Sequence, residues 1–173
     1  MGFLRPSSTL VGLDLGSDRL KVVELTRAGR TYNLARMASA PVSAAAFRDG
    51  VPAAPEELGP QIRSLFDKAG IRTDRVVVGA GGQNVTVREV RVPPMTAQEL
   101  TAAVRYEAER YLPYNVQDVH MDYQVMGESS EDGRKMLDVV VVATRRDVVQ
   151  RIVETVEAAK LEPANMDVES FAL

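Results

Sequence analysis

Short apolar stretches that alternate with polar positions fill the first 42 residues and predict three consecutive strands. These strands are expected at residues 10–14, 20–26 and 31–42. The turns between them fall at Gly16–Asp18 and Arg27–Arg30, where small and polar residues interrupt the apolar pattern. The chain is therefore expected to begin as a strand–turn–strand–turn–strand segment.

A different spacing follows, because apolar residues recur along one face of residues 55–69 and predict a helix. Pro55 suits the first turn of that helix, and Gly70 stops it. The apolar run at 76–78 then predicts a buried strand. A β-β-β-α-β unit is complete by Gly82.

The second half of the chain again alternates between strand-like and helix-like patterns. Thr96 and Glu99 form the S/T-x-x-E pattern of a capping box, and Pro113 ends the helix that this box begins. The elements expected, in chain order, are a strand at 84–92, a helix at 96–112, a hairpin of strands at 122–126 and 136–143, a helix at 148–159 and a final extended segment at 165–168.

These elements predict an α/β fold with mixed sheets and two subdomains. The first subdomain is expected to comprise residues 1–83 with 164–173, and the second, residues 84–163, is inserted between its strands. Two amphipathic helices that face one hairpin should form the core of the inserted subdomain. The core residues expected there are Val104, Ala108, Val140, Val142, Ile152 and Val153.

Composition narrows the classes of function. The chain has 21 basic and 24 acidic residues and a net charge of −3, which gives no support to nucleic-acid binding. It has no cysteine, so disulfides and thiolate metal sites are excluded, and its single histidine, His120, excludes a histidine-rich metal site. No apolar run approaches the ~20 residues of a membrane span, so a cytoplasmic location is expected.

The strongest chemical signal is the first predicted turn. Asp14 closes the first strand, Gly16 and Ser17 follow it, and Lys21 lies in the second strand. Backbone N–H groups in a glycine turn can approach phosphate oxygens closely, and a carboxylate can hold Mg²⁺ through its water. The same D-x-G-S pattern also occurs in hairpins where it serves only to turn the chain. As a candidate site, the turn is similar to the first phosphate loop of the actin-like ATPase superfamily.

Several longer segments resemble one family, the PilM proteins of the type IV pilus inner-membrane platform. The resemblance covers nearly the whole chain and is most specific in the middle. The segments that carry it are Asp14–Lys21, Val92–Leu100, Tyr106–Tyr114, Met121–Val125 and Leu161–Leu173.

The resemblance implies an actin-like fold with an RNase-H-like subdomain 1A and an inserted strand-helix-strand-strand subdomain 1C. It implies that ATP and Mg²⁺ bind in the complete protein, with Asp14 as the metal-facing carboxylate. The nucleotide-binding positions implied are Asp14, Gly16, Ser17, Lys21 and Glu169. A complete member continues past Leu173 into a second phosphate loop and a second lobe, so this chain alone is expected to bind ATP weakly and whether it has enzymatic activity stays open.

The resemblance also implies a partner, the cytoplasmic N-terminal peptide of the membrane protein PilN, in a groove between the two subdomains. The partner-binding residues expected are Val92, Met95, Arg105, Glu109 and Arg110. The alternative interpretation is that these charges only keep the helix surface solvated. The pilus motor ATPases and a second copy of the chain are further expected partners. The protein is expected to be cytoplasmic and peripheral to the inner membrane, which it reaches only through PilN. The alternative function is that of a membrane-tethered, filament-forming division ATPase similar to FtsA.

Overall fold

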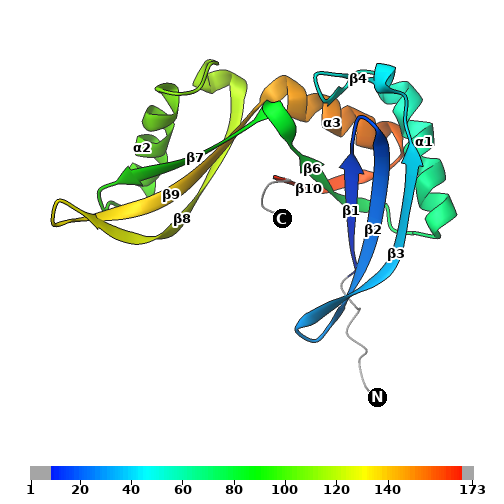
Figure 1. Ribbon diagram of the computed structural model, residues 1–173, viewed down its shortest axis with the longest axis horizontal. Coiled ribbons are helices and arrows are strands. Elements are labelled where there is room, and N and C mark those ends of the chain that lie inside the picture. Colours follow the sequence, from blue (N-terminus) through cyan, green and yellow to red (C-terminus); the bar gives the residue numbers. More distant parts are fainter. Residues whose placement is uncertain (1–8, 169–173) are drawn as a thin grey trace. The chain divides into compact units, whose positions relative to one another are not determined.

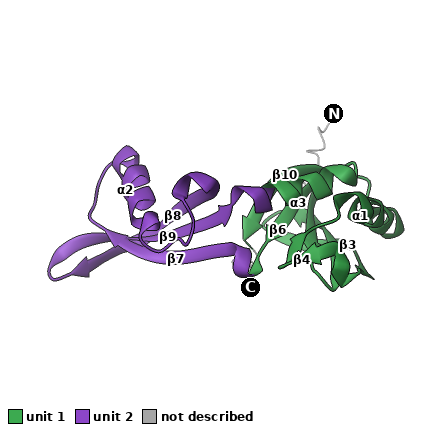
Figure 2. Ribbon diagram, turned by 90° about the horizontal axis from the view of Figure 1, so that it is seen from above, with its two compact units in different colours: residues 1–82, 150–173 green, residues 83–149 purple. Residues whose placement is uncertain are grey.

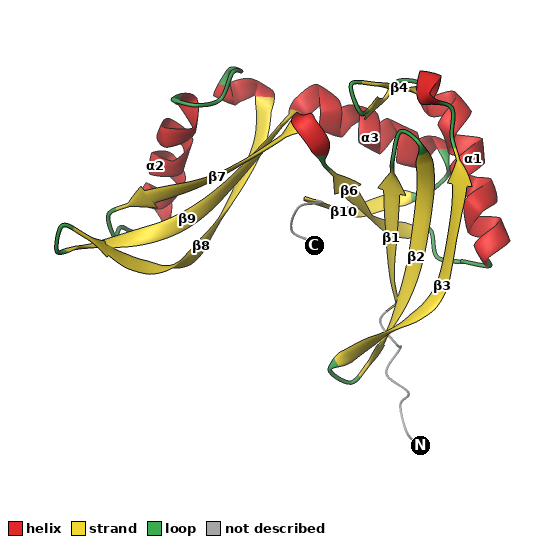
Figure 3. Cartoon of the chain, in the orientation of Figure 1, coloured by secondary structure: helices red, strands yellow, loops and turns green. Residues whose placement is uncertain are grey.

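A computed structural model describes residues 9–168 of the chain (Figures 1 and 3). The chain divides into two compact units, coloured separately in Figure 2. Unit 1 contains the residues up to 82 together with those from 150 onwards, and unit 2 contains residues 83–149. Within residues 9–168, no helix combines the length and the apolar character that are required to cross a lipid bilayer.

Unit 1 is built on a five-stranded sheet with the strand order β10-β6-β1-β2-β3. β1, β2 and β3 are antiparallel neighbours, whereas β6 is parallel to both β1 and β10. The strands of this sheet are β1 (Thr9–Leu15), β2 (Arg19–Ala28), β3 (Thr31–Pro41), β6 (Arg75–Ala80) and β10 (Glu162–Val168). The first four follow the expected pattern, which confirms the β-β-β-α-β unit.

Helix α1 (Pro55–Ala69) covers one face of this sheet. Its start follows from Pro55 in the first turn, and its end from Gly70, whose φ of 72° is left-handed and whose N–H bonds the carbonyls of Asp67 and Phe66. The buried side chains of the helix are Leu58, Ile62, Leu65 and Phe66, and those of the sheet face include Val11, Leu13, Leu20, Val22, Val76 and Val78. The short strands β4 (Phe47–Arg48) and β5 (Val51–Pro52) form a separate pair.

The other face of the β1–β3 hairpins exposes apolar side chains. Cross-strand pairs place Leu10 opposite Leu25, and Leu25 opposite Leu34, so these three residues share one face. Leu34 is 57% exposed, and Met37, further along β3, is 66% exposed. Within residues 9–168, β3 pairs with β2 alone, so it forms an edge of the sheet.

Unit 2 contains a three-stranded antiparallel sheet in the order β7-β9-β8, with helix α2 on one face (Figure 3). The elements are β7 (Val85–Val92), α2 (Ala97–Glu109), β8 (Val119–Glu131) and β9 (Arg134–Arg145). Its largest hydrophobic cluster consists of Val92, Leu100, Val104, Val139 and Val141.

The expected core of unit 2 was wrong at two strand positions. Val139 and Val141, not Val140 and Val142, are the buried valines of β9. Alternate strand residues face opposite ways, and a run of four valines does not show which pair faces the helix. The helix α2 decides which pair is buried, because its Leu100 and Val104 pack in one cluster with Val139 and Val141.

The structure also moves the second domain boundary from 163 to 149. Helix α3 (Arg146–Ala158) was expected inside the inserted subdomain, but the residues from 150 onwards, including Ile152 and Val153, belong to unit 1. The physical reason is close packing between α1 and α3. A Cβ added at Gly59 would lie 2.6 Å from the carbonyl carbon and oxygen of Ala158.

The β8–β9 hairpin is longer than expected. Residues 128–131, which were expected to lie in a loop, continue β8 and pair with Arg134–Leu137. Only Asp132 and Gly133 form the turn, both with positive φ, 50° and 74°, which is the geometry of a two-residue type I′ turn. The ends of both strands carry mostly polar side chains, so they lack the alternation of apolar and polar residues that predicts a strand.

Candidate functional site

The β1–β2 hairpin brings Asp14 and Lys21 directly opposite each other. The Lys21 Nζ atom donates a hydrogen bond of 2.7 Å to Oδ2 of Asp14. The Asp14 side chain is 39% exposed and the Lys21 side chain is 55% exposed, so the pair lies at the surface of the sheet and is open to a ligand. A cation at Asp14 would therefore compete with the ammonium group of Lys21.

The turn itself requires glycine at position 16. A Cβ at Gly16 would lie 2.7 Å from the carbonyl oxygen of Arg19, which is shorter than real Cβ contacts. Ser17 is exposed, and the N–H of Val42 bonds the carbonyl of Asp18 at 3.0 Å and so holds the turn from β3. The hairpin thus presents bare backbone at Gly16 next to the carboxylate of Asp14.

The surface beside Asp14 is also bare, because Gly12 precedes it by two residues on the same side of β1. A Cβ added at Gly12 would find no atom within 4 Å. A carboxylate, backbone N–H groups of a tight turn and a lysine are the donor set that Mg²⁺ and phosphate groups require. The residues present therefore fit a magnesium–phosphate ligand. Among residues 9–168, no group of three or more carboxylates and imidazoles could hold a metal ion without such a ligand. Glu169, the fifth expected position, lies outside the described residues.

The second predicted site lies on unit 2, along α2. The capping box forms as expected: the Glu99 N–H bonds Oγ1 of Thr96, and Oε2 of Glu99 accepts from the Thr96 N–H at 2.9 Å. The Thr96 hydroxyl also donates a 2.8 Å bond to Oε2 of Glu99. The bonds that the carboxylate accepts from the Thr96 N–H, which has the larger effect, and from the Thr96 hydroxyl hold the pKa of Glu99 below its ordinary value. The capping box fixes the residue at which α2 begins. A 2.9 Å hydrogen bond between the hydroxyls of Thr101 and Tyr123 joins the first turns of α2 to strand β8.

The structure separates the five expected partner residues into two groups. Val92 is only 4% exposed and belongs to the core, so it offers no side chain to a partner. Met95 is half-buried against the same cluster. Arg105, Glu109 and Arg110 are exposed on the outer side of α2, where Arg110 also pairs with Glu107 at 3.2 Å.

Comparison with known proteins identifies the family. The model of the family "Type IV pilus assembly protein PilM" matches residues 12–173. The chain belongs to the PilM family. A solved structure described as the PilM-PilN type IV pilus biogenesis complex is similar over 96% of this chain, with 32% sequence identity and a TM-score of 0.85. The match confirms the expected mixed α/β, actin-like fold of PilM. This chain covers 49% of that PilM chain, so it spans about half of its length.

A second solved structure shares the fold. It is the cytoplasmic domain of EpsL, an inner-membrane component of the type II secretion system of Vibrio cholerae. The likeness covers 93% of this chain and 56% of that one, at 22% identity and a TM-score of 0.53. At this identity the comparison supports the fold alone.

One exposed residue of the PilM-like helix was missed by the sequence reasoning. Tyr106 is 68% exposed and follows Arg105 on the outer side of α2. Helical spacing could have found it, because positions 100, 104 and 108 define the buried face and 106 lies opposite. Large exposed aromatic side chains are enriched in protein–protein interfaces, so Tyr106 joins the candidate partner residues.

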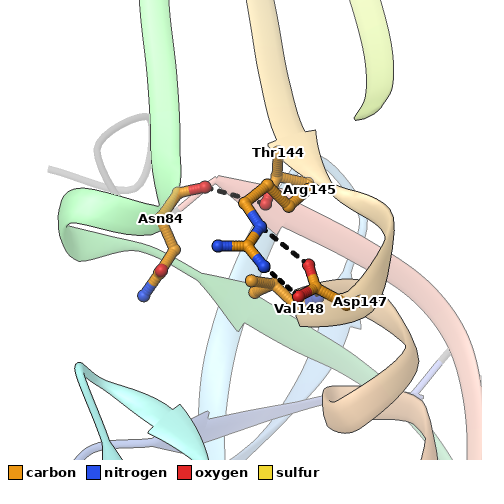
Figure 4. A network of polar contacts seen from close by, with 5 residues as sticks. All are labelled: Asn84, Thr144, Arg145, Asp147 and Val148. Atoms are coloured by element: carbon orange, nitrogen blue, oxygen red, sulfur yellow. Dashed lines mark hydrogen bonds and ion pairs between the residues drawn. The ribbon is translucent and has the colours of Figure 1, made fainter. Parts of the chain in front are cut away.

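A polar network was also missed, where β9 runs into α3 (Figure 4). Arg145 forms a two-point ion pair with Asp147, and its guanidinium lies 5.4 Å from the ring centroid of Tyr114. The hydrogen bonds that Arg145 donates to the carboxylate of Asp147 are the main cause that raises the pKa of Arg145. The Thr144 hydroxyl donates a 2.9 Å bond to the carbonyl of Asn84, which connects the end of β9 to the segment that enters unit 2. The network stabilises the entry and exit of the inserted unit.

Proposed function

We propose that this chain is the part of a pilus-assembly protein that docks the cytoplasmic N-terminal peptide of PilN and supplies one side of a Mg-ATP site. The single observation that carries the proposal is the match of 96% of the chain, at 32% identity, to a PilM solved with PilN. The family match favours this function over the FtsA-like alternative. The protein would then be cytoplasmic and reach the inner membrane through its partner.

The outer side of α2 supports peptide docking. Tyr106 offers an exposed aromatic anchor, and Arg105 and Arg110 flank it with positive charge. Apolar anchors contribute most of the affinity of such sites, whereas charged side chains raise the association rate. We therefore place the peptide on α2 of unit 2, with Met95 at its edge.

A fluorescently labelled synthetic peptide of the PilN N-terminus tests this site by fluorescence anisotropy. We expect Tyr106→Ala to weaken binding about tenfold or more. Arg105→Glu and Arg110→Glu should weaken it less and should reduce its dependence on salt. Arg134→Glu is the matched control, because Arg134 is an exposed arginine of the same unit at the far end of the β8–β9 hairpin. Unchanged affinity in all three α2 variants would contradict the proposal.

The β1–β2 hairpin supports the nucleotide site. Asp14 would hold Mg²⁺ through a water molecule, the N–H groups of Gly16 and Ser17 would approach the phosphates, and Lys21 would neutralise phosphate charge. Bound Mg-ATP supplies the phosphate charge that these groups recognise. The remaining part of the site is expected from the second half of the PilM fold, so this chain alone should bind ATP weakly.

Calorimetry with Mg-ATP on a PilM protein that contains this chain and the second lobe tests the assignment. We expect Asp14→Ala to abolish binding, while Asp18→Ala, in the same turn, leaves it unchanged. Equal affinity of wild type and Asp14→Ala would contradict the phosphate-loop assignment. Binding to the pilus motor ATPases and self-association are separate proposals that pull-down with the purified ATPases and analytical ultracentrifugation can test.

A further inference from the structure

Three parallel strands of unit 1 end at the same edge of the sheet. β1 and β10 are both parallel to β6, which lies between them. The register pairs Leu13 of β1 with Val78 of β6, and Asp167 of β10 with Gly79. Asp14 follows Leu13 as Gly79 follows Val78, so Asp14, Gly79 and Asp167 lie in one row across the strand ends.

The three residues also share one face of the sheet. Leu13 and Val78 are 2% and 0% exposed and face the core, so the residues that follow them face the opposite side. Asp167 is exposed on that side. The residue between the two carboxylates, Gly79, has no side chain.

The spacing suits one hydrated cation. Two strand spacings of about 4.8 Å put the Cα atoms of Asp14 and Asp167 about 10 Å apart. A magnesium ion has water ligands at about 2.1 Å. Each water can donate to a carboxylate at about 2.7 Å. Two such paths through one ion join carboxylate oxygens that are about 10 Å apart, which is close to the spacing of the two strands that carry them. In nucleotide sites, Mg²⁺ keeps several water ligands and uses one or two carboxylates.

Charge gives an independent reason for a second carboxylate. Lys21 lies 2.7 Å from Asp14 and offsets its charge, so Asp14 alone offers little net attraction to a divalent cation. The Val168 N–H donates a 2.7 Å bond to Oδ1 of Asp167, which restricts the rotation of that carboxylate. Asp167 would thus supply a held negative charge on the far side of Gly79.

We propose that Asp167 is the second metal-facing carboxylate of the nucleotide site and orients the water shell of Mg²⁺ opposite Asp14. The proposal rests on the Mg-ATP function proposed above. It predicts that the Asp167 carboxylate has opposite effects on ATP affinity in the presence and in the absence of metal. With metal present, its charge favours the bound ion, and without metal it repels the phosphates of ATP.

The test uses a PilM protein that contains this chain and the second lobe, with Mn²⁺ as the probe, read by electron paramagnetic resonance, and ATP affinity measured with and without metal. Asp167→Asn should weaken Mn²⁺ binding in the presence of ATP about tenfold, as removal of outer-shell partners does. In EDTA, the same variant should bind ATP as tightly as wild type or more tightly. Glu162→Gln is the matched control, because Glu162 is an exposed acid at the other end of β10.

The outcomes separate the two proposals. Absence of Mn-ATP binding by the wild-type protein would overturn the nucleotide function and this inference together. Binding that is lost in Asp14→Asn but unchanged in Asp167→Asn would overturn the role of Asp167 and leave the function standing. Weaker ATP binding by Asp167→Asn in EDTA as well as in Mn²⁺ would show a structural effect and also overturn it.

Discussion

Glu24 of β2 is 7% exposed and accepts a hydrogen bond from Nη1 of Arg36 in the adjacent strand β3. Burial of a carboxylate without a cationic partner lowers the stability of the fold. Arg36, which is about half exposed, supplies the positive charge from the rim of the core. Arg36 also lies close to the end of α1, with its Nε 3.6 Å from a Cβ built at Gly70. The pair therefore connects β2 and β3 to the end of α1.

We expect Arg36→Met to lower the free energy of unfolding by about 1–3 kcal/mol, because Glu24 would remain buried and unpaired. The double variant Glu24→Leu with Arg36→Met should recover most of this loss. Urea unfolding followed by circular dichroism measures both. Arg75→Met is the control, because the Arg75–Glu162 pair is exposed and should contribute less than about 0.5 kcal/mol. An equal loss in the single and double variants would contradict the argument.

Gly59→Ala should destabilise the protein, although alanine favours helices over glycine by about 1 kcal/mol. The added methyl group would lie 2.6 Å from the Ala158 carbonyl, so α1 and α3 must move apart at an expected cost of about 1–3 kcal/mol. Thermal unfolding measures the change. Gly127→Ala is the control, because a Cβ at Gly127 would find no atom within 4 Å. A higher melting temperature for Gly59→Ala would show that the helices are not in contact here.

The β1–β2 hairpin contains two glycines whose surroundings differ, so their substitutions form a matched pair. Gly16→Ala should lower the unfolding free energy by about 1–3 kcal/mol, because its Cβ meets the Arg19 carbonyl at 2.7 Å. Gly12→Ala, in β1 before the turn, has open space at its Cβ and should change the unfolding free energy by less than about 0.5 kcal/mol. Equal effects of the two substitutions in chemical denaturation would rule out the close turn at Gly16.

The capping box makes the stability of unit 2 depend on pH. The pKa of Glu99 is lowered in the folded protein by its bonds to Thr96, so its contribution is complete above about pH 4.5 and is lost as the pH falls through the lower folded value. We expect wild type to lose more unfolding free energy between pH 6 and pH 3 than Glu99→Gln does. Denaturant titrations at the two pH values measure this difference. A loss of the same size in both proteins would contradict the capping contribution.

The sequence was sufficient where one local signal determined one outcome. The capping pair Thr96 and Glu99 fixed a helix start, and the glycine turn at Gly16 fixed a hairpin. It was insufficient where distant packing decides. The face of β9 that carries Val139 is selected by α2, and the unit to which Ile152 belongs is selected by the contact of Gly59 with Ala158.

The candidate site shows the same division. Asp14, Gly16, Ser17 and Lys21 are neighbours in the chain, so their meeting could be predicted. Asp167 lies far away in sequence, and only the parallel pairing of β10 with β6 brings it to the same edge. Val92 was expected among the partner residues, but it is buried in the core. The alternation of apolar and polar residues along β7 does not show that α2 covers the face on which Val92 lies.

The open edge of the unit 1 sheet has a consequence for how the protein behaves in concentrated solution. β3 is eleven residues long, pairs on one side only within residues 9–168, and exposes Tyr32, Leu34 and Met37. Such an edge is a template for adding another strand, including the same strand from a second molecule. Arg36, whose charge also serves the core, and Pro41, which cannot donate a ladder hydrogen bond, act against such growth. Precipitation and fibre formation on concentration should therefore begin at β3, and replacing Leu34 with a charged residue is the substitution that should prevent them.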